Sequence, residues 1–116
     1  MSNSIVMRLD RKDFDRLKAG LKCWEVRLND EKRKGINVGD EIVFMRRPDL
    51  EDRLPMVVEE KQRFSDIQRL LDKVPLSEVA PEEGMSEVAW IQDFMTHYRP
   101  EEVVTSGLVA FKVRKA

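Results

Sequence analysis

The sequence predicts an α+β protein, a small mixed β-barrel of about five to six strands with three or so short helices. Short alternating apolar segments recur along the chain, as in half-buried strands. Amphipathic helical segments interrupt them without a strict strand–helix alternation. This order favours a largely antiparallel sheet, and in so short a chain we expect the sheet to curl into a barrel.

The 116 residues are expected to form one domain, residues 1–116, because typical domains hold about 100–150 residues. No apolar run approaches the roughly 18 residues that a membrane span requires. Met1 to Val6 lacks the charged, apolar and small-residue blocks of a signal peptide, so we expect a cytoplasmic protein. The sequence leaves the oligomeric state open, with a monomer as the default expectation.

The chain begins with a predicted strand and helix. Ile5–Leu9 alternates between apolar and polar side chains and is predicted as the first strand. Asp10 is expected to cap a helix that ends near Gly20. The apolar face of this helix is expected to contain Phe14, Leu17 and Leu21.

Alternation resumes in Cys23–Leu28, the second predicted strand. One or two helical turns are expected in residues 29–35, which have acidic residues first, basic residues last and a final glycine. Glu41–Arg47 and Leu54–Arg63 are predicted as the third and fourth strands.

The second half of the chain is mainly helical. Ser65 or Asp66 is expected to cap a helix that Pro75 ends, and Ser86 a further helix that Pro100 stops. The inner stripe of the helix after Ser86 is predicted to be Val88, Ile91, Met95 and Tyr98. Gly107 then introduces the last strand, which continues to residue 113.

Charge is distributed unevenly, although the formal net charge is only −1. Residues 1–47 contain 12 Lys/Arg against 8 Asp/Glu, residues 48–103 contain 6 against 14, and residues 104–116 contain three basic residues and no acidic one. Two basic ends meeting in one sheet would give a basic face opposite acidic helices.

Cys23 is the only cysteine and His97 the only histidine, which excludes an internal disulfide and a Cys/His zinc site. No metal or cofactor is expected. Cys23 is interpreted as a small buried hydrophobe, and His97 as structural or merely exposed.

Lys22, Glu25 and Arg27 are the residues most suited to chemistry. Glu25 and Arg27 are two apart on one strand, so they share a face, and Lys22 lies at the corner beside them. An arginine fork binds phosphate or a base edge, a glutamate accepts from an amino group or moves a proton, and a lysine adds charge. The alternative is a solvated strand face with weak ion pairs.

Four further residues are weighed for ligand contact. Lys32 and Arg33 are placed to touch phosphates, although a basic last turn also suits a helix end. Ser65 is placed to line a cleft or to cap its helix. Trp24 can stack on a base, but its parity with Val26 favours burial in the barrel.

Residues 22–40, KCWEVRLNDEKRKGINVGD, resemble the signature of ASCH domains, which belong to the PUA-like superfamily. The resemblance includes Gly-x-Lys at the start, a Glu-Val-Arg strand, an Asn-Asp-Glu-Lys-Arg turn and a closing Val-Gly-Asp. It extends over nearly the whole chain and is strongest in residues 20–44.

This resemblance implies a PUA-like barrel with a cleft beside the second strand and a role in RNA metabolism. The family's pattern falls on Gly20, Lys22, Glu25 and Arg27. Some relatives hydrolyse the amide of acetylated cytidine with a threonine nucleophile at the position of Glu25. A carboxylate is a poor substitute for that hydroxyl in amide attack.

Three functions are therefore compatible with the sequence. The first is binding of RNA or a modified nucleoside. In this function phosphate is bound by Lys22, Arg27 and Lys32 or Arg33, and Glu25 accepts hydrogen bonds from the donor edge of a base. The second is a small hydrolase or ribonuclease with Lys22 and Glu25 as catalytic acid and base. The third is a protein-interaction domain that uses the acidic residues 48–103.

Overall fold

The computed structural model describes residues 4–116; residues 1–3, part of the stretch that lacks a signal-peptide pattern, lie outside the described residues. The strands are β1 Ser4–Leu9, β2 Trp24–Leu28, β3 Glu41–Arg46, β4 Arg53–Phe64 and β5 Leu108–Lys115. All five match strands expected from the alternating segments. Alternation therefore located the sheet correctly.

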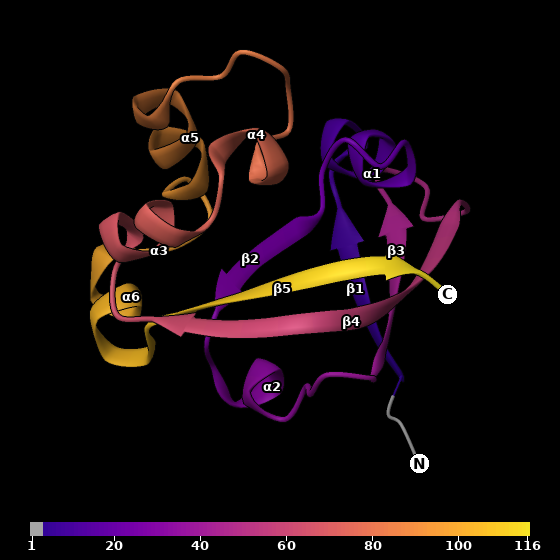
Figure 1. The fold of residues 1–116 in the computed structure, drawn as a ribbon, viewed down its shortest axis with the longest axis horizontal. Coiled ribbons are helices and arrows are strands. Elements are labelled where there is room, and N and C mark those ends of the chain that lie inside the picture. The colour runs from indigo at the N-terminus through magenta and orange to yellow at the C-terminus, as the bar shows by residue number, and fades with distance from the viewer. Residues whose placement is uncertain (1–3) are drawn as a thin grey trace.

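The strands form one mixed sheet in the order β1-β3-β4-β5-β2. Only β1 and β3 pair in parallel among the described strands, and the remaining pairs are antiparallel. The sheet curls into a half-barrel, with an irregularity between Val58 and Glu60 in the long strand β4 (Figure 1). The predicted α+β fold with a mixed, barrel-like sheet is confirmed.

Six helices are present in residues 4–116, more than the three or so expected. They are α1 Arg11–Lys18, α2 Glu31–Lys34, α3 Ile67–Lys73, α4 Leu76–Val79, α5 Glu87–Phe94 and α6 Pro100–Ser106. Pro100 begins α6 instead of only ending the preceding helix, because a proline is tolerated in the first turn. None of the helices in this part of the chain is long and apolar enough to cross a membrane.

Two cores lie on the two faces of strand β5. Val109 and Phe111 are fully buried in a core between the curled sheet and α1, whereas Leu108 and Ala110 are buried against α3–α6. Figure 1 shows α3–α6 grouped on one side of the sheet and α1 at the other end. Strand β5 therefore buries side chains on both of its faces.

Strand β2 also buries side chains on both of its faces. Trp24, however, does not lie where it was predicted. Trp24 is buried, but it packs in the helical core and not inside the barrel, and its Nε1 donates to Glu78 Oε1 at 3.3 Å. Glu25 is paired with Phe111 and Arg27 with Val109. The two charged side chains of β2 therefore face the barrel side of the sheet.

Two residues that were expected on apolar faces are exposed. Helix α5 buries Trp90 and Phe94, and Ile91, Met95 and Tyr98 of the predicted stripe are partly buried against the same core, but Val88 is 65% exposed. The rings of Trp90 and Phe94 stack at 5.2 Å, and burying them removes more apolar area than burying the valine would. Leu21 is 57% exposed because α1 ends at Lys18, before that residue.

Candidate functional site

A cavity of roughly 290 Å³ lies between the sheet and the helices α4 and α5. One wall consists of residues from the two edge strands, β1 and β2, together with the start of α1. Further lining residues come from α4, α5 and the segments that follow them. Lys22, Glu25 and Arg27 all line the cavity, so the structure brings these three predicted residues together.

Glu25 is the centre of a buried ion network. Its Oε1 lies 3.0 Å from Lys22 Nζ, and its Oε2 accepts from Arg27 Nε at 2.7 Å. Lys22 Nζ also donates to Asp13 Oδ1 at 2.6 Å. Lys22 and Glu25 are only 5% and 6% exposed, so the alternative of a solvated strand face does not hold. Two cations and two carboxylates make the network formally neutral.

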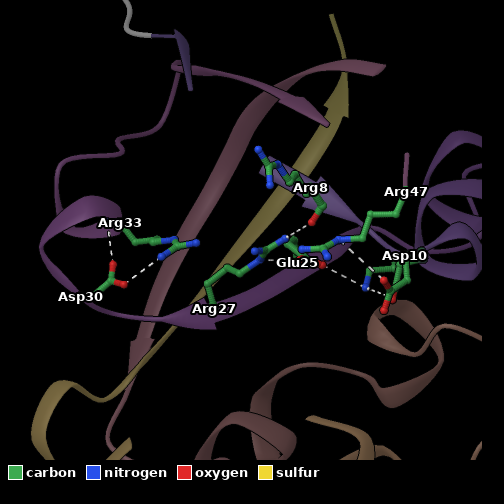
Figure 2. Close-up of polar contacts among 9 residues, drawn as sticks. Arg8, Asp10, Glu25, Arg27, Asp30, Arg33 and Arg47 are labelled. Carbon is green, nitrogen blue, oxygen red and sulfur yellow. Dashed lines mark hydrogen bonds and ion pairs between the residues drawn. The ribbon is translucent and has the colours of Figure 1, made fainter. Parts of the chain in front are cut away.

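The network also joins the two edges of the sheet, which share no backbone ladder. Arg27 of β2 donates from Nη2 to the carbonyl oxygen of Arg8 in β1, at 2.8 Å (Figure 2). The Lys22–Asp13 pair makes a second link, from a residue two positions before β2 to the helix that follows β1. Side-chain contacts therefore close the seam of the half-barrel.

Opposing effects determine the ionisation of the network. Burial alone would raise the pKa of Glu25, but the charges of Lys22 and Arg27 outweigh it and hold the pKa below its ordinary value. Burial would lower the pKa of Lys22, yet Glu25 and Asp13 raise it. Burial dominates at Asp13 and raises its pKa. Glu25 and Lys22 therefore both remain charged at neutral pH.

The depressed pKa of Glu25 predicts how stability depends on pH. A carboxylate with a lowered folded pKa contributes stability above its ordinary value of 4.5 and loses it as the pH falls through the folded value. We expect the difference in unfolding free energy between the wild type and Glu25→Gln to be constant from pH 7 to about 5 and to shrink below 4.5. Denaturant unfolding at several pH values measures this difference. An unchanged gap at pH 3 would contradict an ionised Glu25 in the folded protein.

Helix α5 and the segment after it supply lining residues that were not predicted as ligand contacts. Trp90, Asp93, Phe94 and His97 all line the cavity, and their spacing of three and four residues is that of one helical face. Tyr98 lies beside them, with its ring 5.1 Å from that of Phe94. Tyr98 belongs to the stripe that was expected to face inward, whereas the places of Trp90 and Phe94 in the cavity lining did not follow from their spacing alone.

Three predicted ligand residues do not line this cavity. Lys32 is exposed on α2, and Arg33 is held there by Asp30 at 2.8 Å, apart from the Glu25 network (Figure 2). Ser65 is exposed at the corner between β4 and α3, where its Oγ accepts from Arg69 at 3.2 Å. The side chain that caps α3 is that of Asp66. The cavity therefore contains half of the six predicted ligand residues.

Cys23 is half-buried, and burial raises the pKa of its thiol, so Lys22 does not activate it. Within residues 4–116, no group of three or more His, Cys, Asp and Glu side chains is placed to hold a metal ion.

Solved structures similar to this chain share its fold over nearly its whole length. Hypothetical protein PH0355 is 27% identical, with a TM-score of 0.85, and the match covers 97% of this chain and 99% of that one. Protein PF0455 from Pyrococcus furiosus is 27% identical, with a TM-score of 0.74, over 99% and 97% of the two chains.

A third structure, ASCH from Zymomonas mobilis, is 16% identical with a TM-score of 0.64, covers 95% of this chain and 66% of that one, and shows the fold alone. A comparison with curated proteins gave no match. The family model of the ASCH domain matches residues 7–113. Because this match spans far more than half of the chain, the protein belongs to the ASCH domain family, as the motif in residues 22–40 predicted.

Proposed function

We propose that this protein binds a single nucleoside unit, free or within single-stranded RNA, in the cavity between the Glu25 network and helix α5. The observation that carries the proposal is that buried charged side chains and aromatic side chains line the same cavity of roughly 290 Å³. Ligand pockets commonly measure about 300–1,000 Å³, so this one suits a small ligand. A nucleoside fits the chemistry because it has a flat apolar face and polar edges.

The aromatic side chains of the lining support stacking on a base. Trp90 and Phe94 are nearly buried, so they form the floor of the cavity, whereas Tyr98 is half-buried and His97 is exposed. Proteins recognise unpaired RNA bases largely by stacking them on such rings. Tyr98 and His97 are therefore the rings we assign to base contact.

The charged side chains of the lining support recognition of a fixed pattern of polar edges. Both oxygens of Glu25 and the ammonium of Lys22 already have partners, so these groups are held in place before a ligand arrives. Preorganised groups lose little entropy on binding. In this proposal Lys22, Glu25 and Arg27 act as a rigid polar surface, a role that differs from direct capture of phosphate by Lys22 and Arg27.

The network favours binding over acid–base catalysis. A general base or acid works best when its pKa lies near the operating pH. The pKa of Glu25 is lowered and that of Lys22 is raised, so both move away from neutrality. The hydrolase or ribonuclease alternative would require a ligand that breaks the Lys22–Glu25 pair.

A binding titration tests the proposal. We expect ribonucleosides, their monophosphates or short single-stranded RNA to change the tryptophan fluorescence, because Trp90 lines the cavity. Stacking on an aromatic side chain contributes about 1–3 kcal/mol per base, so Tyr98→Ala should weaken binding about ten-fold or more. His97→Ala should weaken it less, because its ring is exposed.

Lys32→Ala and Arg33→Ala are the matched controls, because both residues lie outside the cavity. They should leave the affinity unchanged. If they weaken binding while Tyr98→Ala does not, the ligand binds at α2 and the proposed site is wrong. Absence of binding by every probe would reject the proposed function itself.

A further inference from the structure

Two arginines at the cavity differ from Lys22 and Arg27 in having little or no carboxylate partner. Arg8 of β1 is exposed, and no carboxylate of residues 4–116 lies within ion-pair distance of it. Arg47, one residue after β3, makes only a contact of 3.8 Å from Nε to Asp10, with 55% and 60% of the two side chains exposed. Both arginines line the cavity.

The geometry of the sheet holds these arginines near each other. Strands β1 and β3 are parallel neighbours, with Arg8 paired with Met45, and the backbone nitrogen of Arg47 donates to the carbonyl oxygen of Leu9 at 2.8 Å. Figure 2 shows the Arg47 side chain extending from its strand end toward Glu25 and Arg27. Arg47 therefore reaches over the seam, at the exposed side of the buried network.

The charged side chains in the buried network are paired with one another, whereas those at the exposed side of the cavity are paired weakly or not at all within residues 4–116. The lining contains four Lys/Arg and four Asp/Glu side chains, and the buried network accounts for two of each. Lys22 and Arg27 have no net charge to offer an anion, because their carboxylates are already in place. The cations that remain are Arg8 and Arg47, opposed by Asp10 and by Asp93 on α5.

We propose that Arg47 and Arg8 bind the phosphate of a nucleotide whose base enters the cavity, so that the ligand class is a phosphorylated nucleotide and not a free nucleoside. This inference rests on the proposed function and adds the anion site to it. A planar guanidinium matches phosphate in a bidentate manner. The exposed contact between Arg47 and Asp10 is easily given up, because exposed ion pairs contribute little.

The position of Asp93 is consistent with the same orientation of the ligand. Asp93 belongs to the part of the lining that α5 supplies, whereas the two arginines come from the sheet, and no cation of residues 4–116 lies within ion-pair distance of Asp93. A carboxylate repels phosphate and accepts from an amino group. The phosphate is therefore directed to the sheet side and the polar edge of the base to the helix side.

The experiment compares the four ribonucleosides, their 5′-monophosphates and a trinucleotide that lacks terminal phosphates, each titrated against the full chain. The wild type should bind monophosphates or the trinucleotide at least ten-fold more tightly than nucleosides. Arg47→Ala and Arg8→Ala should remove this gain and leave nucleoside affinity within about two-fold. A gain confined to the monophosphates identifies a free nucleotide, and one confined to the trinucleotide identifies the RNA backbone.

Arg53→Ala is the matched control, because Arg53 is an exposed arginine of β4 that does not line the cavity. Arg53→Ala should still bind the phosphorylated probes more tightly than nucleosides, by the same factor as the wild type. If Arg53→Ala loses this preference as Arg47→Ala does, the phosphate is attracted unspecifically and the inference is overturned. Nucleosides that bind as tightly as their monophosphates would also overturn it, while leaving the proposed function intact. If neither nucleosides nor phosphorylated probes bind, the proposed function fails together with the inference.

Discussion

Replacing Glu25 with alanine is expected to lower the free energy of unfolding by about 3–5 kcal/mol. The substitution leaves Lys22 without one of its two carboxylates and Arg27 without its only one in the ion network, and Lys22 is 5% exposed. A buried charge that loses its partner retains the cost of leaving water, which is why such losses exceed those at the surface. Denaturant unfolding at pH 7 measures the effect.

Glu31→Ala provides the control, because it removes the same charge from an exposed pair. Glu31 lies 3.3 Å from Lys34, with the two side chains 95% and 53% exposed. Exposed pairs contribute about 0–1 kcal/mol, so this variant should unfold almost as the wild type does. A Glu25→Ala protein within about 1 kcal/mol of the control would show that the seam does not depend on the network.

The expected loss is large compared with the stability of a small domain, which is typically about 5–15 kcal/mol. The reason lies in topology, since β1 and β2 are the two edges of the sheet and no backbone ladder joins them. Arg27 and Lys22 cross this gap by side-chain contacts to Arg8 and Asp13. Removing Glu25 therefore weakens the contacts that join the two edges of the sheet.

The strands could be predicted from the sequence because alternation is a local signal. The helices were harder: α4 is four residues long and follows Pro75 without an apolar repeat of its own. Helix α5 was expected to turn Val88 inward, although Trp90 and Phe94 are the buried residues. Which face a short helix buries depends on the partner surface, here β2 and β5, and that partner is set by tertiary structure.

For the candidate site, the spacing of Glu25 and Arg27 showed that they share a face, and the residues themselves indicated ionic chemistry. Their burial was not predictable, because it results from strand β2 having a core on both sides. Asp13, Arg8 and Arg47 reach the cavity from other parts of the sheet and from α1. No spacing rule within one segment identifies contacts between segments so far apart in the sequence.

The second large effect is expected for Gly107→Ala, which should lower the free energy of unfolding by about 3 kcal/mol or more, as measured by denaturant unfolding. Gly107 joins α6 to β5 with φ 71° and ψ −172°, a conformation that side chains rarely adopt and that costs of order 1–3 kcal/mol. An added Cβ would also lie 2.9 Å from the carbonyl oxygen of Phe64. That oxygen belongs to the backbone at the end of β4, where Phe64 pairs with Leu108, so it cannot move aside as a side chain could.

Gly84→Ala separates the two causes of this loss. Gly84 has a similar φ of 74°, and a Cβ there would meet no atom within 4 Å, so only the backbone strain of about 1–2 kcal/mol remains. Equal losses in the two variants would mean that the end of β4 yields to the methyl group. The comparison bears on the site as well, because the Gly107 carbonyl accepts from Asn29 at 2.9 Å and so fixes the end of β2. A shift at Gly107 would therefore displace the hydrogen-bond acceptor of Asn29, the residue that directly follows β2.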